Sequence, residues 1–538
     1  MGSHGGDMEL GRLIEGLPIE VVGKDAAGAA RVRVCDLTDD SRTAVPGSLF
    51  VARRGHAQDG RLYAAAAVEC GAVAILTDDR GIDPGERSRA VVLHTTDVPC
   101  MTGVLAERFY GEPSRELALV GVTGTNGKTT VSHAIQGLLK ASGVRCGLMG
   151  TVQIDDGREV ARAVLTTPGA IEISRTLATM VESGCEACVM EVSSHALDQG
   201  RASGLGFDVG VFTNLTGDHL DYHGDEESYA RAKRKLIESL GEGGVAVVNI
   251  DDERGSWMGA GAPDGVELRA CSLTDPGAPW RATAEDATID GMRVRVRGPE
   301  FEIGGRVGLI GAFNAMNVLE AVAGADAVLA GLGWKGEDRA GALGEALGAI
   351  RPPAGRLERV HPHGVSERGG IVGVRVLVDF AHTDDALSST LRAVRPVVPE
   401  GGKLVVVFGC GGDRDRSKRP RMGRAAAELA DRVVVTSDNP RTESPSAIVS
   451  QILEGIPQGR RGAVEVHVER ENAIREAILG AGEGDVVVIA GKGHETEQIS
   501  SDGLGGLLRR HFDDREVAGK YLRERRLRRA GAAAGGVA

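Results

Sequence analysis

The chain has 538 residues, too many for one ordinary hydrophobic core, and this length predicts about three domains. A formal charge of -13 at pH 7 and an aromatic content of 3% argue against a general nucleic-acid or anionic-membrane role. The 42% of hydrophobic residues and the 78 glycines suit an α/β protein with many tight turns.

The cysteines and the apolar runs indicate a cytoplasmic protein. The eight cysteines are scattered through the chain, which is the pattern of reduced thiols. The single C-x-x-C pair, Cys185 and Cys188, has no second pair, so we interpret it as the entrance to a core strand rather than a zinc or redox site. No apolar run approaches the ~20 residues of a membrane span, and the first residues lack the features of a signal peptide. We therefore expect no membrane insertion.

Residues 1–113 form the first predicted domain, a small α/β unit. Apolar runs at 47–51 and 71–76 predict strands, with a short helix between them. The polar segments 40–42 and 55–61 fall in loops, where their side chains could meet a ligand. Solvated turns are the alternative interpretation of both segments.

Residues 114–351 form the second predicted domain, and its first motif predicts a phosphate-binding loop. A buried strand is expected before the glycine-rich loop and a helix after Lys128, so the loop opens a helix N-terminus. Lys128 would reach the terminal phosphates, and the hydroxyl of Thr129 or Thr130 would hold Mg²⁺. The loop is a variant, because Val122 stands where the common nucleotide loop has glycine. A glycine-rich turn with a solvated lysine is the alternative.

Two strand ends of this domain carry candidate metal ligands. The strands predicted at 187–190 and 209–212 lead into Glu191 and His219, and ligands of parallel α/β sheets bind beyond such carboxyl ends. Because a triphosphate and a second anionic reactant repel each other by several kcal/mol, two Mg²⁺ ions are expected. The expected ligands are Thr129 or Thr130, Glu191 and His219. The alternatives are a solvated Glu191 and a transition-metal cluster of His219, Asp221 and His223.

Residues 352–522 form the third predicted domain, which follows a helix-breaking proline pair. Strands alternate with helices, an order that predicts a Rossmann-like doubly wound sheet. The strands are expected at 374–378, 404–408, 432–436 and 485–490, and the helices at 421–430, 446–455 and 472–481. Ser444 and Pro445 supply an N-cap and a first-turn proline for one helix. Residues 523–538, rich in arginine and then in alanine and glycine, predict a disordered tail.

A series of motifs in fixed order spans nearly the whole chain. They are DSR at 40–42, GTNGKTT at 124–130, LTTP at 165–168, EVSSH at 191–195, NLTGDHLDYHG at 214–224, GAFNAMN at 311–317, GRLE at 355–358, DFAH at 379–382, FGCGGDRD at 408–415 and DNPR at 438–441. Together they resemble the motifs of the Mur ligases, ATP-dependent amide-forming enzymes of peptidoglycan precursor synthesis.

The resemblance is closest to the subgroup that adds the third residue of the peptide. It implies an α/β fold of three domains: an N-terminal UDP-binding domain, a central P-loop-type ATPase domain with a mostly parallel sheet, and a C-terminal amino-acid-binding domain. It also implies a cytoplasmic monomer that adds meso-diaminopimelate to UDP-N-acetylmuramoyl-L-alanyl-D-glutamate. ATP would be the co-substrate, two Mg²⁺ ions the cofactors, and an acyl phosphate on the substrate carboxylate the intermediate.

The resemblance further implies the roles of individual residues. The UDP-linked dipeptide would be held by Asp39, Ser41, His56, Ala57, Gln58, Thr166, Thr167, Ser193, Gln199 and Arg201. ATP would be held by Gly124, Thr125, Asn126, Gly127, Lys128, Thr129, Thr130, Asn317, Arg356 and Asp379. The amino acid would be held by Arg414, Asp438, Asn439, Pro440, Arg441, Gly491 and Glu495. The catalytic groups would be Lys128, Glu191, His219 and Lys233.

Lys233 matches the position at which the family carries a lysine N-carboxylated by CO₂. An ordinary ammonium beside Mg²⁺ would be repelled, whereas the carbamate of Lys233 would be an oxygen ligand of the metal. Lys235 points to another face of the predicted helix and is the weaker candidate. A plain surface lysine in a basic helix is the alternative interpretation of Lys233.

Three charged residues of the third domain predict amino-acid specificity. Arg414 is expected to bind a carboxylate of the incoming amino acid, and a solvated charged face is the alternative. Arg441 and Glu495 are expected to pair with the distal carboxylate and ammonium of meso-diaminopimelate. L-lysine lacks that carboxylate and would leave Arg441 unpaired, at a cost on the order of 2–5 kcal/mol. The alternative is an Arg441 that holds its own loop through backbone carbonyls.

Other assignments share part of this pattern. Phe380 and Asp384 depart from the tyrosine and proline that the family often has, although neither is a reacting group. A folylpolyglutamate-synthase-like ligase shares the nucleotide loop, and a ligase that adds L-lysine shares the other motifs. A regulatory or scaffolding protein that had lost catalysis would lack Lys128, Glu191 or His219, and none of these is missing.

Overall fold

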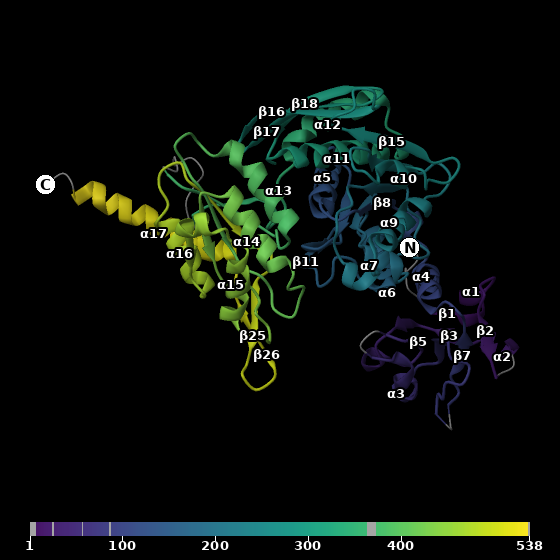
Figure 1. Cartoon of the computed structure of the whole chain (residues 1–538). Helices are drawn as coiled ribbons and strands as arrows, with labels where there is room; N and C mark the ends of the chain where they lie inside the picture. Colours follow the sequence, from purple (N-terminus) through teal and green to yellow (C-terminus); the bar gives the residue numbers. More distant parts are fainter. Residues whose placement is uncertain (1–6, 24–25, 56–57, 86–87, 363–372, 536–538) are drawn as a thin grey trace. The chain divides into compact units, whose positions relative to one another are not determined.

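The computed structural model describes residues 7–23, 26–55, 58–85, 88–362 and 373–535, and Figure 1 labels their helices and strands. The chain forms two compact units. Unit one comprises Met1–Ala282, Val296–Ile303 and Met316–Ala346, and unit two comprises Thr283–Arg295, Gly304–Ala315 and Leu347–Ala538. Within the described ranges, no helix is both long and apolar enough to cross a membrane.

A five-stranded sheet forms the N-terminal part of unit one (Figure 1). Its order is β2-β7-β6-β5-β4, with β2 antiparallel to β7 and the other pairs parallel. Leu49, Leu76 and Leu93 of this sheet share a buried cluster with α1 and α4. The elements are β1 (Met8–Glu9), α1 (Leu10–Ile14), β2 (Glu20–Val22), α2 (Ala26–Ala30), β3 (Arg33–Val34), β4 (Asp36–Thr38), η1 (Ser41–Thr43), β5 (Ser48–Ala52), η2 (Gly60–Tyr63), α3 (Ala64–Glu69), β6 (Ala74–Thr77), β7 (Val91–His94), α4 (Val98–Phe109) and η3 (Pro113–Arg115).

An eleven-stranded sheet has the order β11-β10-β9-β12-β8-β13-β14-β15-β16-β17-β18. The neighbouring strands β9, β12, β8, β13, β14, β15 and β16 are parallel. Strand β10 is antiparallel to both of its neighbours, β9 and β11. Its elements and helices begin with β8 (Ala118–Thr123), α5 (Lys128–Ala141), β9 (Cys146–Met149), β10 (Gln153–Asp155), β11 (Val160–Arg162), α6 (Ala170–Glu182), β12 (Ala187–Glu191), α7 (Ser194–Asp198), β13 (Val209–Phe212), α8 (Leu220–His223) and α9 (Glu226–Glu238). They continue with β14 (Val245–Asn249), α10 (Gly255–Gly259), β15 (Glu267–Ser272), β16 (Trp280–Thr288), β17 (Gly291–Arg297), β18 (Glu302–Val307), α11 (Ala312–Gly331), α12 (Gly336–Ala346) and η4 (Leu347–Ala349). Because β8 lies between β12 and β13, the loops that follow these three strands meet at one edge of the sheet.

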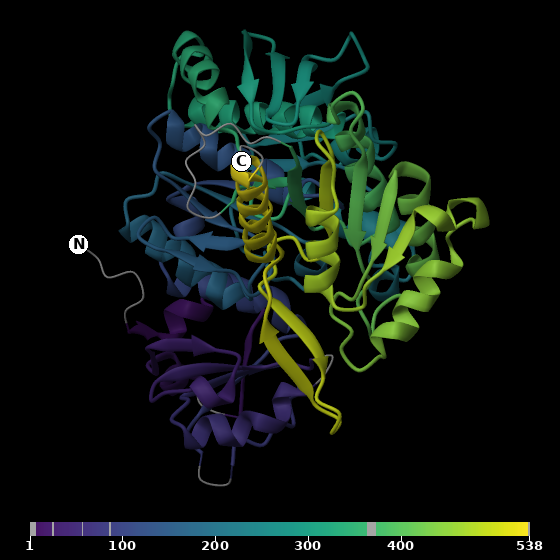
Figure 2. The ribbon, with the colours of Figure 1, turned by 90° about the vertical axis from the view of Figure 1, so that its left-hand side faces the viewer.

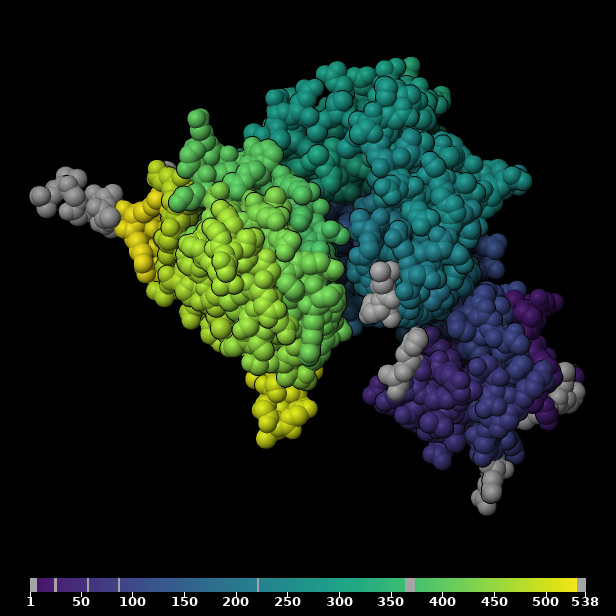
Figure 3. Space-filling view, in the orientation of Figure 1, coloured from purple at the N-terminus to yellow at the C-terminus, as the bar shows by residue number. Residues whose placement is uncertain are grey.

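A six-stranded sheet of order β19-β20-β24-β21-β22-β23 forms the core of unit two. Only β19 at its edge is antiparallel to its neighbour. Its elements are β19 (Glu358–Val360), β20 (Arg375–Asp379), α13 (Asp384–Val394), η5 (Arg395–Val397), β21 (Leu404–Phe408), α14 (Lys418–Leu429), β22 (Arg432–Val435), α15 (Pro445–Glu454), η6 (Gln458–Ala463), β23 (Val464–Val466), α16 (Arg470–Leu479), β24 (Val486–Ala490), β25 (Glu497–Ser501), β26 (Leu507–His511) and α17 (Asp514–Gly535). The hairpin β25–β26 projects from the surface of this unit (Figure 3).

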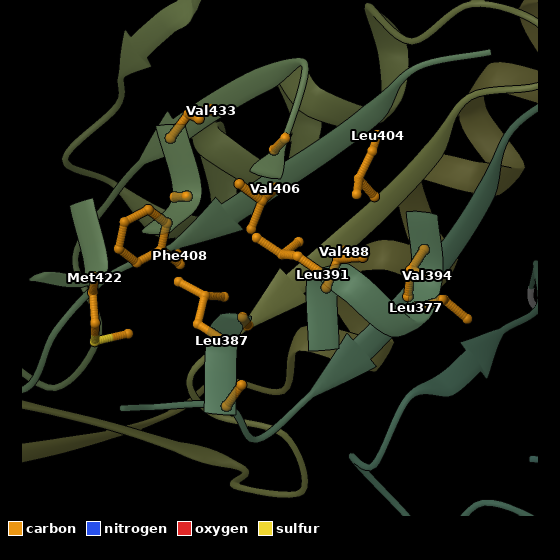
Figure 4. Close-up of a cluster of buried hydrophobic side chains, with 14 of the residues drawn as sticks. Leu377, Leu387, Leu391, Val394, Leu404, Val406, Phe408, Met422, Val433 and Val488 are labelled. Carbon is orange, nitrogen blue, oxygen red and sulfur yellow. The ribbon is translucent and has the colours of Figure 1, made fainter. Parts of the chain in front are cut away.

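Both faces of the six-stranded sheet are covered, as a doubly wound sheet requires. Leu377 packs with residues of α13, α14 and α15 in one buried cluster (Figure 4). The neighbouring Val376 and Val378 pack with α16 and α17 in another. Side chains alternate across a strand, so burial of both faces explains why these strands are continuous apolar runs in the sequence.

The predicted disordered tail is wrong for residues 523–535, which continue helix α17 (Figure 2). Tyr521 and Leu522 pack in the buried cluster with α16. Arg525 is 8% exposed, and its guanidinium donates to the carbonyl oxygens of Ile478 (2.7 Å), Leu479 (3.0 Å) and Ala481 (2.5 Å). One arginine thus satisfies carbonyls at the end of α16, a role that an arginine-rich composition does not reveal.

Glu320 of α11 generates a prediction about stability. Its side chain is 0% exposed, and neither carboxyl oxygen has a hydrogen-bond partner among the described residues. Burial raises its pKa well above the usual 4.5, and nearby Asp252 adds to this effect. Its contribution to stability is therefore complete below pH 4.5 and is lost as the pH rises through the folded-state pKa. We expect Glu320→Gln to melt roughly 2–4 °C above the parent at about pH 8, and this gap to shrink toward about pH 4.

The measurement is thermal unfolding followed by circular dichroism across this pH range. Glu337→Gln, at an exposed position of α12, is the matched control and should leave the melting temperature unchanged. A gap between Glu320→Gln and the parent that does not depend on pH would contradict the raised pKa of Glu320.

Candidate active site

The glycine-rich loop between β8 and α5 fits only glycine at two positions. Gly124 and Gly127 have φ of 146° and 87°, conformations that residues with a side chain rarely adopt. A Cβ atom would lie 1.9 Å from Thr213 Oγ1 at Gly124 and 2.7 Å from Asn317 Oδ1 at Gly127. The loop is therefore packed directly against the end of β13 and against α11.

The end of β13 also holds the loop by hydrogen bonds. The Thr125 N–H donates to Asn214 O (2.8 Å), and the Asn126 N–H donates to Asn214 Oδ1 (2.9 Å). Lys128 Nζ donates to Gly124 O (2.8 Å) and Thr125 O (2.9 Å), which folds its side chain back over the loop. A rigid loop, a helix N-terminus and an ammonium group thus lie together, an arrangement suited to a polyphosphate.

Glu191, at the end of β12, lies beside this loop. Its side chain is 0% exposed, so the alternative of a solvated acid is wrong. Its Oε2 accepts hydrogen bonds from the hydroxyls of Thr129 (3.0 Å) and Thr151 (2.8 Å), and its Oε1 accepts from the Thr151 N–H (2.8 Å). No hydrogen bond joins Thr130 to Glu191 within the described part of the chain, so Thr129 is the hydroxyl that meets the carboxylate. A carboxylate and hydroxyls are the hard oxygen donors that Mg²⁺ prefers.

The residues expected to hold the sugar-peptide form a chain of contacts that begins at Glu191. Thr167 Oγ1 donates to Glu191 O (2.8 Å) and accepts from the Ser193 N–H (3.0 Å). Arg201 donates to Thr167 O (2.9 Å) and to Gln199 Oε1 (2.6 Å). Thr166 Oγ1 lies 3.1 Å from Thr151 Oγ1 and so joins the same group. The structure thus brings these five predicted residues together.

His219 and Lys233 both lie near the Tyr229 ring. His219, in the left-handed conformation at φ 54°, has its ring 6.3 Å from the Tyr229 ring and 4.9 Å from the His195 ring. Lys233 is 1% exposed; its Nζ lies 4.3 Å from the Tyr229 ring centre and donates to Gly124 O (2.7 Å). The alternative of a surface lysine is therefore wrong for Lys233.

The surroundings of Lys233 disfavour its charged form. Burial lowers its pKa well below the usual range, and the positive charge of Lys128 lowers it further. Lys235, two residues on, is half exposed and pairs with Asp198 at 3.3 Å. Among the described side chains, which do not include Asp221, no group of three or more His, Cys, Asp or Glu residues is arranged to hold a metal, so the transition-metal alternative gains no support. His223 Nε2 instead lies 3.0 Å from Ser194 Oγ.

The described residues among those expected to hold UDP, Asp39, Ser41 and Gln58, lie between strands of the N-terminal sheet. Asp39 follows β4 and pairs with Arg53 at 3.5 Å, and Ser41 opens η1. Gln58 Oε1 accepts from the Tyr63 hydroxyl (3.4 Å). His56 and Ala57 lie outside the described residues.

In unit two, the two residues expected to contact ATP occupy different surroundings. The Asp379 carboxylate, at the end of β20, accepts hydrogen bonds from the N–H of Leu357 (2.8 Å) and Ala381 (3.0 Å) and from the Thr390 hydroxyl (2.9 Å). The Arg356 guanidinium stacks at 4.4 Å from the ring centre of Phe380. The Asp379 carboxylate therefore accepts hydrogen bonds from neighbouring residues of its own unit, whereas the planar guanidinium of Arg356 lies over an aromatic ring.

The residues expected to hold the amino acid come from the loops after β21, β22 and β24. Arg441 Nη1 donates to Gly412 O (2.7 Å), so its guanidinium does hold a loop carbonyl, as its alternative interpretation proposes. Burial lowers the pKa of Arg441, and the nearby charge of Arg414 lowers it further. Two guanidiniums thus share one region, which is an arrangement suited to a carboxylate.

A carboxylate lies within the same group of loops. Asn439 Nδ2 donates to Glu495 Oε2 (2.8 Å). A Cβ atom at Gly491 would lie 2.6 Å from Asp438 Oδ2, so glycine is needed where these loops meet. The carbonyl oxygen of Pro440 would lie 1.9 Å from a Cβ atom at Gly412. The structure therefore brings Asp438, Asn439, Arg441 and Glu495 together, with Arg414 on the adjoining loop.

Sequence reasoning missed several residues that build these sites. Thr151 follows β9 and supplies two of the hydrogen bonds to Glu191. Its position after a parallel strand is the same signal that marked Glu191. Arg419, 0% exposed, and Lys492, also 0% exposed, hold loops of unit two. A sequence gives no sign that these two cations are buried.

Models of known families match most of the chain. The Mur ligase middle domain matches residues 122–325, the glutamate ligase domain of Mur ligases matches 355–493, and the Mur ligase family catalytic domain matches 36–110. A UDP-N-acetylmuramoyl-L-alanyl-D-glutamate--2,6-diaminopimelate ligase from Synechococcus elongatus is 41% identical over 533 residues, which covers 96% of this chain and 99% of that protein. The chain belongs to the Mur ligase family.

Two further proteins support this placement. A ligase of the same name from Chlorobaculum tepidum is 43% identical over 494 residues, covering 90% of this Mur ligase and 92% of the relative. A solved structure of a ligase of that name is 31% identical, has a TM-score of 0.66 and covers 97% of this chain and 100% of its own. The predicted α/β Mur ligase fold with three domains is confirmed, whereas the domain boundaries near 113 and 351 stay predictions.

The eight cysteines form no disulfide bond. All eight cysteines are free thiols, and both members of the C-x-x-C pair, Cys185 and Cys188, are buried in the hydrophobic cluster around β12. The interpretation of that pair as a core element is confirmed.

The ion pair between Arg419 and Glu443 predicts an acid-sensitive site. Arg419 donates to Glu443 Oε1 (2.8 Å) and Oε2 (3.0 Å), and the Asp413 N–H donates to Oε1 (2.7 Å). The hydrogen bonds from Arg419 lower the pKa of Glu443 to about 2 from a usual 4.5. The stability that Glu443 contributes is therefore present above pH 4.5 and is lost as the pH falls toward about 2. We expect Glu443→Gln to melt roughly 2–4 °C below the parent at about pH 6. The difference between the two melting temperatures should shrink as the pH falls below about 4.

Differential scanning calorimetry over this range would check the prediction. Glu454→Gln, on the exposed side of α15, is the control. A deficit of Glu443→Gln that persists unchanged at about pH 3 would mean that the ion pair is not its cause.

Proposed function

We propose that this Mur ligase adds meso-diaminopimelate to UDP-N-acetylmuramoyl-L-alanyl-D-glutamate with the hydrolysis of ATP to ADP and phosphate. The relatives that match it over nearly their whole length carry the name of that ligase. The observation that carries the amino-acid assignment is the convergence of Arg441 and Glu495, because a guanidinium and a carboxylate in one region suit a zwitterionic group. The free thiols and the nucleotide-linked substrates support action in the cytoplasm as part of peptidoglycan precursor synthesis.

The chemistry follows from the inertness of a carboxylate toward an amine. The γ-phosphoryl group of ATP passes to the carboxylate of the D-glutamyl residue and gives an acyl phosphate and ADP. The free amine of the amino acid attacks the acyl carbon, the tetrahedral intermediate collapses, phosphate leaves, and the amine loses a proton. Lys128 and the N–H groups at the start of α5 are the groups of this chain that stabilise the charge gathered on the phosphoryl oxygens.

Magnesium fits the oxygen donors beside the loop. Thr129 and Glu191, joined at 3.0 Å, would hold one ion, and His219 with a carboxylated Lys233 would hold a second. When bound, the ions neutralise phosphate charge and orient the transferring group. The buried contact between a hydroxyl and a carboxylate supports the first ion more strongly than the exposed ring of His219 supports the second.

Lys233 is suited to carboxylation by CO₂. A neutral amine is the nucleophile in this reaction, and burial beside Lys128 favours the neutral form of Lys233. Its nitrogen attacks the carbon of CO₂, loses one proton and becomes a carbamate with two carboxylate oxygens. The modification converts a buried amine into an anionic oxygen donor that a metal ion would attract.

The remaining substrate contacts follow the groupings seen in each unit. Asp39, Ser41, His56, Ala57 and Gln58 would hold the UDP end. Thr166, Thr167, Ser193, Gln199 and Arg201 would hold the sugar-peptide. Asn317, Arg356 and Asp379 would contact ATP. We also propose that the enzyme acts as a monomer.

The first test of the function is substrate selection. Purified enzyme receives ATP, Mg²⁺, the UDP-linked dipeptide and either meso-diaminopimelate or L-lysine, and the tripeptide product is measured. We expect kcat/KM for L-lysine to be at least about thirtyfold lower, because L-lysine leaves Arg441 without its carboxylate. Arg441→Gln should lower kcat/KM for meso-diaminopimelate by about the same factor and leave that for L-lysine nearly unchanged.

Arg461→Gln, an exposed arginine of η6, serves as the control for a lost surface charge. Equal efficiency with the two amino acids would overturn the specificity and leave the ligase reaction standing. Release of ADP without any amine-dependent product would overturn the ligase reaction itself.

The second test concerns Lys233. We expect Lys233→Ala to lower kcat about a hundredfold or more, since a ligand that acts on the phosphoryl transfer is lost. Added bicarbonate or short carboxylic acids should restore part of the rate by placing a carboxylate in the vacated space. Lys235→Ala, on another face of α9, is the control and should keep the parent rate. A parent-like rate in Lys233→Ala, or the lack of a carbamate signal in NMR spectra of the parent with isotopically labelled CO₂, would refute the modification.

A further inference from the structure

Lys492 is a buried cation at the edge of the amino-acid-binding loops of unit two. It follows β24 and is 0% exposed. Its Nζ donates hydrogen bonds to Asn439 Oδ1 (3.2 Å), Glu495 Oε2 (3.1 Å) and Glu497 O (2.5 Å). An ammonium has three N–H donors. All three are therefore used within the protein, and Lys492 has no donor left for a substrate.

These contacts fix the two side chains on which the proposed specificity depends. Asn439 Oδ1 accepts from Lys492 and from the Ile499 N–H (3.0 Å), so the amide group of Asn439 has one orientation. Asn439 Nδ2 then donates to Glu495 Oε2 (2.8 Å). Lys492 thus reaches Glu495 both directly and through Asn439.

The two oxygens of Glu495 consequently differ. Oε2 accepts hydrogen bonds from Lys492 and Asn439. Oε1 takes part in no hydrogen bond or ion pair within the described ranges, and the Glu495 side chain is 35% exposed. A carboxylate held by one oxygen presents the other in a fixed direction, so Oε1 is the acceptor available to a ligand.

Charge favours the same arrangement. Asp438 Oδ1 lies 3.9 Å from Lys492 Nζ, so the lysine stands beside two carboxylates. Without its positive charge, Asp438 and Glu495 would repel each other at short range, and the side chain of Glu495 would swing toward solvent. Glu495 also acts electrostatically on Arg441, which places a carboxylate and a guanidinium around one region.

We propose that Lys492 is a positioning residue for diamino-acid specificity: it holds Oε2 of Glu495 and Oδ1 of Asn439, so that Oε1 of Glu495 receives the second ammonium group of the amino-acid substrate. The inference rests on the proposed function and adds to it the residue that aims the carboxylate. A lysine that only stabilised the fold would affect all amino acids alike. A lysine that aims Glu495 affects only substrates with a second ammonium group.

The experiment compares two amino acids that differ in that group alone. Steady-state kinetics of parent enzyme and Lys492→Met are measured with meso-diaminopimelate and with 2-aminopimelate, which keeps the distal carboxylate and lacks the distal amine. We expect Lys492→Met to raise KM for meso-diaminopimelate about tenfold or more, the effect of one charge-assisted hydrogen bond. KM for 2-aminopimelate and both kcat values should change by less than about twofold.

Matched variants separate aiming from stability. Lys520→Met removes an exposed lysine of the same unit that pairs with Glu471 at 2.7 Å, and should leave both KM values unchanged. Lys492→Gln keeps N–H donors without the charge and is measured in the same way should Lys492→Met fail to fold. In a Glu495→Gln background, replacement of Lys492 should raise KM for meso-diaminopimelate by less than about twofold, because the residue through which it acts is already changed.

Each outcome decides the proposal. Equal rises in KM for the two amino acids, or no rise for either, would overturn it, as would an undiminished effect in the Glu495→Gln background. The parent enzyme reports separately on the proposed function, since its formation of tripeptide from meso-diaminopimelate does not depend on any Lys492 variant.

Discussion

The carbonyl oxygen of Gly124 accepts hydrogen bonds from two lysines, Lys128 at 2.8 Å and Lys233 at 2.7 Å, and the central site depends on this contact. Two ammonium groups held by one oxygen repel each other, and burial adds to the cost of charging Lys233. Lys128 lies closer to solvent and to the loop, where a phosphate would compensate its charge. The low pKa of Lys233 is the consequence of this conflict, and it links the packing of the loop to the proposed carboxylation.

In unit two, buried cations hold the loops that carry the residues expected to bind the amino acid. Arg470 and Asp514 form an ion pair in which both side chains are 0% exposed, and Arg470 also donates to Ser437 O (3.3 Å) and Ala490 O (3.0 Å). These carbonyls lie at the ends of β22 and β24. Arg419 and Lys492 hold the neighbouring loops in the same way. Loss of one partner from such a pair leaves a buried charge without compensation, so these cations fix loops that have no regular structure of their own.

The sequence predicted the parallel strands and the loop of the central site because buried strands are continuous apolar runs and glycine marks a tight strand-to-helix turn. Other features depend on contacts between distant residues. Ser444 does precede α15, yet its side chain makes no capping hydrogen bond. Lys233 in a charged helix and Arg525 in an arginine-rich tail look solvated in sequence, and only the packing around them makes them buried. The hairpin β25–β26 lacks an apolar pattern because much of it is exposed.

The hydrogen bond from Thr129 to Glu191 explains how the proposed magnesium site can be stable in the folded chain without a bound ion. A fully buried carboxylate is costly unless donors satisfy it, and Thr129 with Thr151 supplies these donors. The same bond turns the hydroxyl hydrogen of Thr129 toward Glu191 and leaves the oxygen lone pairs directed elsewhere. A metal ion that takes one of these lone pairs does not have to break the bond. The contact that stabilises the folded chain would thus also orient the hydroxyl of the proposed magnesium site.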